Sequence, residues 1–96
     1  MDIFRIESFD ELFEAILKLE SLDDCRKFFE DVCTIKELQD ITQRLEVAKL
    51  LSNGKNYQEV CKATGASTAT ISRVNKCLLY GKGGYKRVLD GRDKND

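Results

Sequence analysis

The residues best suited to chemistry lie between positions 67 and 76, where two hydroxyl side chains are followed by two cations. Ser67 and Thr68 supply the two hydroxyl groups at the start of this segment, and Arg73 and Lys76 supply the positive charges. Short polar side chains can come close to the edges of nucleic-acid bases, and cations pair with phosphates. A helix that begins at Ser67 would add free N–H groups that also favour a phosphate. The segment therefore predicts contact with a nucleic acid.

Helical spacing separates the apolar residues of this segment from its small and cationic ones. At about 100° per residue, Ile71, Val74 and Leu78 fall on one side of a helix that reaches about Leu79 or Tyr80. The opposite side is small near its start and cationic further along, as a helix that enters a major groove requires. We expect DNA contacts on this outer side from Ser67, Thr68, Ala69, Ser72, Arg73 and Lys76.

A shorter helix precedes this one, and the pair fits a helix-turn-helix within residues 57–79. Gly65 tolerates the left-handed backbone that the turn needs, and Cys61, one turn earlier, is small enough for close helix approach. Gln58 and Lys62 on the first helix are expected to touch the flanking DNA backbone. Apolar contacts between the two helices should fix their crossing angle. The expected core of the motif is Val60, Cys61, Gly65, Ile71, Val74 and Leu78.

The chain lacks the residue types and spacings on which most enzymes depend. It has no His, which is the commonest general base near neutral pH and the commonest metal ligand. Its four Cys form no C-x-x-C pair, so we expect reduced thiols in the core rather than metal ligands or disulfides. Residues 81–84 are Gly-rich but do not match the phosphate loop G-x-x-x-x-G-K-[ST]. We therefore expect no catalytic activity, no metal and no cofactor.

The charge is divided unevenly along the chain. Residues 1–50 hold 13 acids and 7 bases, whereas residues 51–96 hold 4 acids and 9 bases. The net charge of −1 conceals this difference. The division suggests a scaffold half and a half that meets an anion. A solvated basic face without a partner has the same charge pattern.

Helix start signals recur, and no segment alternates like a strand. Capping boxes begin at Ser8, Thr34 and Asn56, and the longest helix is expected over about residues 35–52. The prediction is an all-α fold of about six helices in one domain, residues 1–89, followed by a flexible polar tail, residues 90–96. No apolar run is long enough for a membrane helix, and the first residues lack the apolar stretch of a signal peptide. A cytoplasmic protein without a membrane partner is expected.

The N-terminal helices are too apolar for a chain of this length to cover. Phe9, Leu12, Phe13, Ile16 and Leu17 form one stripe at helical spacing. A chain of 96 residues has limited means to bury several such faces. Pairing two copies through these helices would bury the excess, so we expect a homodimer. The long helix adds a further apolar stripe at Ile35, Leu38, Ile41, Leu45 and Ala48.

The run Gly65-Ala66-Ser67-Thr68-Ala69-Thr70-Ile71-Ser72-Arg73 resembles the recognition-helix motif of the Trp repressor superfamily. Residues 38–85 resemble the YerC/YecD branch of Trp repressor-like proteins. The resemblance implies an intertwined, all-helical homodimer that binds double-stranded operator DNA and regulates transcription, with repression as the expected mode. It places the base-reading and phosphate-contacting surface on Thr68, Ala69, Ser72 and Arg73.

Only some residues of the family's effector pocket have a counterpart in this sequence. Tryptophan-binding members have an Arg at the place of Arg73, followed by a Gly that leaves room for the indole, whereas Val74 follows here. A second ligand-binding Arg of the family corresponds to Gln43 or Arg44, depending on the placement of one gap. Arg44 and Arg73 therefore remain the effector-site candidates. Tryptophan is not expected as the co-repressor, because a branched side chain fills the space that an indole needs.

One alternative function has a different basis. The basic half could dock on an acidic protein partner while the apolar half recruits another chain. Such a protein-interaction module would pass through heparin at moderate salt and would not retard DNA. The sequence leaves this alternative open beside the DNA-binding regulator.

Overall fold

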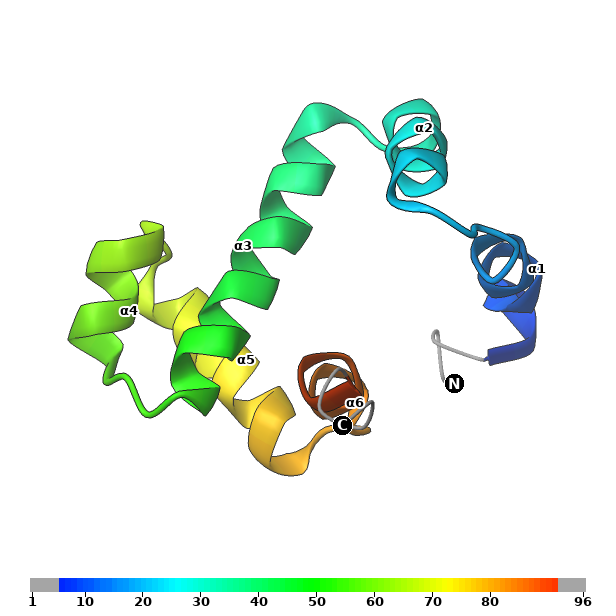
Figure 1. Ribbon diagram of the computed structural model, residues 1–96. Helices are drawn as coiled ribbons and strands as arrows, with labels where there is room; N and C mark the ends of the chain where they lie inside the picture. The colour runs from blue at the N-terminus through cyan, green and yellow to red at the C-terminus, as the bar shows by residue number, and fades with distance from the viewer. Residues whose placement is uncertain (1–5, 92–96) are drawn as a thin grey trace. The chain divides into compact units, whose positions relative to one another are not determined.

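The computed structural model describes residues 6–91 of the chain, with the side chains of residues 9–90. This part of the chain contains six helices and no strand (Figure 1), which confirms the predicted all-α fold. The chain divides into two compact units, of which the first ends at Leu38 and the second begins at Gln39. The helices are α1 (Ile6–Ile16), α2 (Leu22–Val32), α3 (Ile35–Ser52), α4 (Tyr57–Thr64), α5 (Thr68–Tyr80) and α6 (Gly84–Gly91).

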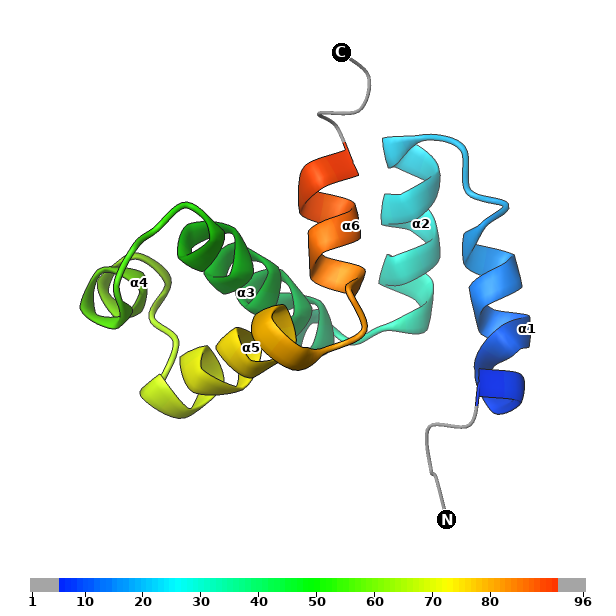
Figure 2. The same cartoon turned by 90° about the horizontal axis from the view of Figure 1, so that it is seen from below.

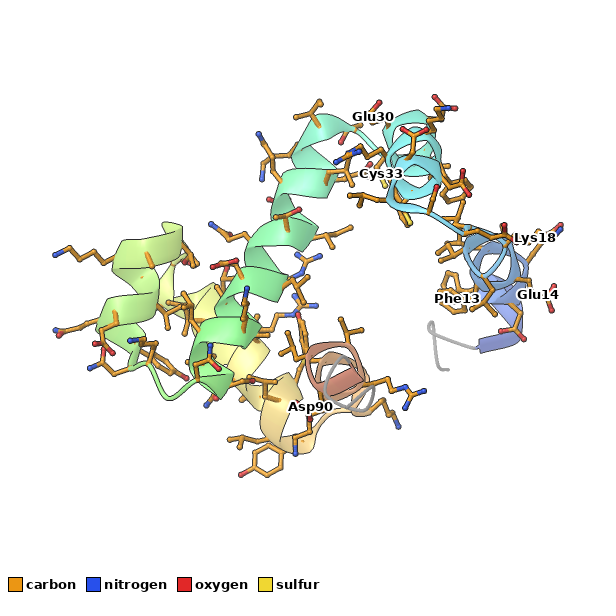
Figure 3. All side chains as sticks on the ribbon, in the orientation of Figure 1. Phe13, Glu14, Lys18, Glu30, Cys33 and Asp90 are labelled. Carbon is orange, nitrogen blue, oxygen red and sulfur yellow. The ribbon has the colours of Figure 1, made fainter. Side chains whose placement is uncertain are left out.

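The start of α1 differs from the prediction. The helix begins at Ile6, so Ser8 lies within its first turn and the predicted helix start at Ser8 is wrong. The ends of helices are the part of an element that sequence signals place least firmly. Phe9 and Phe13 are one turn apart, and their ring centroids are 6.3 Å apart. Figure 3 shows Phe13 and Glu14 on different sides of α1.

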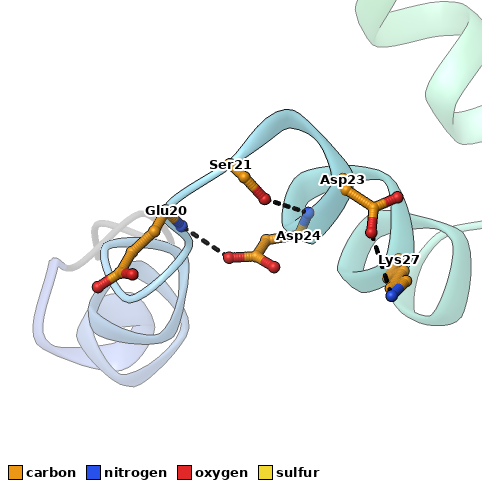
Figure 4. Close-up of polar contacts among 5 residues, drawn as sticks. All are labelled: Glu20, Ser21, Asp23, Asp24 and Lys27. Atoms are coloured by element: carbon orange, nitrogen blue, oxygen red, sulfur yellow. Dashed lines mark hydrogen bonds and ion pairs between the residues drawn. The ribbon is translucent and has the colours of Figure 1, made fainter.

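Polar side chains fix the start of α2. The Ser21 hydroxyl accepts a hydrogen bond from the backbone N–H of Asp24 at 3.0 Å, and the Asp24 carboxylate accepts one from the N–H of Glu20 at 3.0 Å (Figure 4). Lys27 and Asp23, one turn apart, form an exposed ion pair at 3.1 Å. The two hydrogen bonds satisfy backbone N–H groups at the start of the helix, and the ion pair joins two side chains on its surface.

The other two capping boxes are present as predicted. Thr34 and Glu37 exchange hydrogen bonds at the start of α3, with distances of 2.8 and 3.1 Å. Asn56 and Glu59 do the same at the start of α4, both at 2.9 Å. Each box satisfies two orphan backbone donors with side chains three residues apart, so the sequence alone specifies where these helices begin.

The second unit holds the buried core. Figures 1 and 2 show α4, α5 and α6 gathered around the C-terminal part of α3. Partly buried Leu50, Leu51, Leu78, Tyr85 and Leu89 pack around six buried residues. Three helices and one turn contribute these six, so the long helix and the helical pair share one core. The six buried residues are Val47, Ala48, Val60, Ala66, Ile71 and Val74.

The apolar stripe expected on α3 is only partly buried. Of its residues in the second unit, Ala48 is buried, but Ile41 and Leu45 are 47% and 39% exposed. Val47 is fully buried instead, on a face of α3 that the stripe did not include. The long helix therefore carries two apolar faces, because a helix can pack against different neighbours on different sides.

The first unit buries no side chain among residues 9–38. Its apolar residues are accessible, and Leu17 and Leu22 are 81% and 67% exposed. The apolar surface that motivates a homodimer is therefore present on the single chain.

The predicted boundary between the last helix and the flexible tail, at residue 90, needs a correction. Because α6 runs to Gly91, Asp90 and Gly91 are helical rather than the start of a flexible tail (Figure 3 labels Asp90). The rest of the predicted tail, residues 92–96, lies outside the described residues. The single domain over residues 1–89 stays a prediction.

Candidate nucleic-acid interface

The turn between α4 and α5 is built around Gly65. Its φ is +75° and its ψ is +4°, a left-handed conformation that glycine adopts without the Cβ clash of other residues. Its N–H donates to the carbonyl of Cys61 at 2.8 Å, which closes the end of α4. Ala66, the next residue, is only 2% exposed. The chain thus turns within three residues and starts α5 beside the core.

Ser67 fixes the first turn of α5. Its hydroxyl oxygen accepts a hydrogen bond from the backbone N–H of Thr70 at 3.1 Å. The same hydroxyl donates to the side-chain oxygen of Thr70 at 3.2 Å. Ser67 is therefore the N-cap of the helix, as the sequence indicates, and its proton is already engaged within the chain.

The two sides of α5 differ in exposure as the helical spacing predicts. Ile71 and Val74 are 0% and 1% exposed, and Leu78 packs at the edge of the core. The small and cationic residues on the other side are all exposed. These are Thr68, Ala69, Ser72, Arg73 and Lys76.

Charge on this outer side is available to a ligand. Neither Arg73 nor Lys76 makes an ion pair with any residue that the structure describes. Gln58 and Lys62 on α4 are exposed as well. Cations without internal partners can pair with phosphates at little desolvation cost, since both partners keep part of their water.

Cys61 is the predicted core residue that the structure does not place in the core. Its side chain is exposed, so it does not mediate the close approach of α4 and α5. Val60, the preceding residue, is fully buried and makes that contact with the core instead. One step along a helix turns a side chain by about 100°, so the two neighbours face different surroundings.

The cysteines as a group also differ from the prediction. Cys25 and Cys33 are partly buried, and Cys61 and Cys77 are exposed, so the four thiols are not core residues. All four are free thiols. Within the described residues, no three His, Cys, Asp or Glu side chains are grouped as metal ligands. In the same part of the chain, no helix combines the length and apolar character needed to cross a membrane.

The two candidate counterparts of the family's second Arg occupy different environments. The side-chain N–H of Gln43 donates to the backbone carbonyl of Thr64 at 3.2 Å. Arg44 instead lines an open groove of about 480 Å³ together with residues of α3 and α6. Arg73 is not among the lining residues, so the groove does not join the two effector-site candidates. The other residues of the groove are Ile41, Leu45, Gly84, Tyr85 and Val88.

Sequence reasoning missed the hydrogen bonds that Thr64 and Gln43 make beside this turn. Thr64 ends α4, and its hydroxyl donates to the carbonyl of Val60 at 2.8 Å and accepts from the N–H of Ala66 at 3.1 Å. Gln43 reaches the same residue from α3. A Thr in the last turn of a helix can signal such a hydroxyl contact. No local signal marks Gln43, because its partner is 21 residues away.

The chain is similar to known proteins over most of its length. The family model described as Trp repressor protein matches residues 7–93. The protein YerC of Bacillus subtilis (strain 168) is 50% identical over 90 residues, which cover 94% of this chain and 86% of YerC. The Trp operon repressor homolog of Xylella fastidiosa (strain M23) is 31% identical over 70 residues, or 72% of this chain and 76% of that protein. The crystal structure of a TrpR like protein from Eubacterium eligens matches with a TM-score of 0.87 and 49% identity, covering 93% of this chain and 92% of the other.

Proposed function

This chain belongs to the Trp repressor family of transcription regulators, and from this premise we propose that it binds operator DNA as a homodimer and represses transcription. The observation that carries the proposal is the exposed outer side of α5, where Arg73 and Lys76 have no partner among the described residues. The base contacts come from Thr68, Ala69, Ser72 and Arg73. The phosphate contacts come from Lys76, Gln58, Lys62 and the N-terminus of α5 at Ser67.

The homodimer follows from the apolar surface of the single chain. No side chain of residues 9–38 is buried, although this segment is rich in Leu, Ile and Phe. Apolar surface of this extent destabilises a monomer in water, and a second copy offers a complementary surface of the same kind. Two recognition helices related by a twofold axis then reach half-sites about 34–36 Å apart.

DNA binding is proposed not to require tryptophan. Val74 is 1% exposed, so its branched side chain fills space in the core beside the middle of α5, at the position where tryptophan-binding members are expected to have Gly. The groove that Arg44 lines does not include Arg73. On a single chain, this groove therefore does not offer both guanidinium groups to one ligand.

Selection of bound duplexes from random DNA tests the proposal. The full chain is incubated with the pool alone, with tryptophan, and with a metabolite extract. We expect a symmetric, two-half-site sequence to be enriched equally with and without tryptophan. Failure to enrich any sequence, together with passage through heparin at moderate salt, would contradict DNA binding and favour the protein-interaction module.

A further inference from the structure

The carbonyl of Thr64 is a polar group at which the helix-turn-helix meets the long helix. Thr64 is the last residue of α4, so its C=O has no partner within that helix. Gln43, from α3, supplies the partner with its side-chain N–H at 3.2 Å, and this contact is partly buried. A carbonyl in such a place needs a donor, because an unpaired buried acceptor destabilises the folded state.

The turn residue itself is held by further hydrogen bonds. The Thr64 hydroxyl donates to the carbonyl of Val60 and accepts from the N–H of Ala66. Gly65, next in the chain, donates to Cys61. Both the carbonyl and the side chain of Thr64 thus have partners, and these contacts connect Gln43 on α3 to the turn before α5.

Gln43 lies one helical turn before Val47 and shares its face of α3. Val47 is fully buried in the core that also holds Val60, Ile71 and Val74. Apolar contacts of this kind are non-directional and allow small rotations of one helix on another. A hydrogen bond is directional, so the amide of Gln43 selects one orientation among those that the apolar core tolerates.

We propose that Gln43 is a positioning residue that holds the helix-turn-helix on α3, through the carbonyl of Thr64, in the orientation that specific DNA binding needs. This inference rests on the proposed function. Specific recognition needs both recognition helices of a dimer at a fixed separation, whereas non-specific attraction to phosphates depends mainly on charge. Loss of the Gln43 contact should therefore weaken specific binding much more than non-specific binding.

The test compares three variants of the full chain on the selected operator and on a random duplex. Gln43→Met keeps a similar side-chain length without a donor, and Gln43→Lys restores a donor of similar reach. Gln39→Met is the matched control, since Gln39 is an exposed Gln one turn earlier on α3. Thermal melting of each variant establishes that it is folded before DNA binding is measured.

We expect Gln43→Met to lose roughly 3- to 10-fold in operator affinity, the equivalent of one hydrogen bond, with little change on the random duplex. Gln39→Met should bind as the unchanged chain does. Gln43→Lys should restore the ratio of operator affinity to random-duplex affinity that the unchanged chain has. The ratio is compared because the added charge raises the affinity for both duplexes. In NMR spectra of the unchanged chain, the Gln43 side-chain amide should exchange slowly, unlike that of Gln39.

Two results would overturn the inference. One is equal operator affinity for Gln43→Met and the unchanged chain. The other is an equal loss on both duplexes, which would indicate general loosening rather than positioning. Failure of the unchanged chain to prefer any duplex is a different outcome, because it removes the proposed function first and the positioning role with it.

Discussion

Gly65 forms the turn between α4 and α5. Its φ of +75° lies in the left-handed region, and a Cβ added there would meet no atom within 4 Å. The constraint on this position is therefore the backbone conformation and not the available space. Any L-residue with a Cβ must adopt the same strained conformation to keep the turn.

Gly65→Ala should destabilise the fold by about 1 kcal/mol or more, because alanine is strained at positive φ. For a domain of this size, that corresponds to a drop in Tm of roughly 4–8 °C. Gly84→Ala is the matched control, since Gly84 also has open space around its Cα but does not have positive φ. Calorimetry that found the same Tm for both variants would contradict this account of the turn.

Arg73 is the residue on which DNA discrimination should depend most. Its side chain is exposed on α5 beside Ser72, with no ion partner among the described residues. Arg73→Ala should reduce operator affinity by roughly 10- to 100-fold, because it removes a charged contact close to the bases. Lys55→Ala, between α3 and α4, should weaken binding only slightly and equally on all sequences. Fluorescence anisotropy on operator and random duplexes measures both, and equal effects from the two variants would refute these roles.

At the scale of elements, α5 depends on its first turn for both its stability and its proposed role. Ser67 caps the helix through the N–H of Thr70, and this same turn is expected to approach a phosphate. The two roles can be separated because aspartate is also a good N-cap but carries a negative charge.

Ser67→Ala should lower stability by about 1 kcal/mol through loss of the cap. Ser67→Asp should keep the stability, since its carboxylate caps the helix, yet bind DNA several-fold more weakly because it repels the phosphate. Urea denaturation and a DNA titration of both variants measure the two effects. DNA affinity of Ser67→Asp equal to that of the unchanged chain would mean that no phosphate lies at this turn.

The long helix α3 has two different neighbours. Its Gln43 and Val47 face the helix-turn-helix, and its Ile41, Arg44 and Leu45 line the groove with α6. At about 100° per residue, Gln43 and Val47 lie on one side of α3, and Ile41, Arg44 and Leu45 lie on another. Changes on one side of α3 should therefore affect the helix-turn-helix and changes on the other should affect whatever contacts the groove.

At the scale of the whole molecule, the uneven distribution of burial is the main feature. Among residues 9–90, the six buried residues all lie from Val47 to Val74, and the first unit has none among residues 9–38. A segment of two amphipathic helices without a buried side chain gains little from folding alone. Association with a second copy supplies the missing burial in the proposed homodimer.

Sedimentation at micromolar concentration should give twice the 11.0 kDa mass of the chain. If such a dimer neutralises four phosphates, the logarithm of its DNA affinity should fall with the logarithm of salt concentration at a slope of about −3.6. A monomer in sedimentation would contradict the proposed dimer, and a slope near zero would contradict the proposed ionic contacts with DNA.

The sequence determined the features of this protein that depend on nearby residues. The capping boxes at Thr34 and Asn56, the turn at Gly65 and the cap at Ser67 involve partners within a few positions, so their residue types specify them. The exposed and buried sides of α5 follow from its period in the same way. For α1 the local signal failed, since the helix already includes Ile6 and Glu7 before Ser8.

Only the tertiary structure decided which faces of these helices are buried. The pairing of Gln43 with Thr64 joins residues 21 positions apart, and the burial of Val47 and the exposure of Cys61 depend on how α3 and α4 are packed. Periodicity shows that a helix has an apolar side, but not which neighbour covers it, because that depends on contacts between elements distant in sequence.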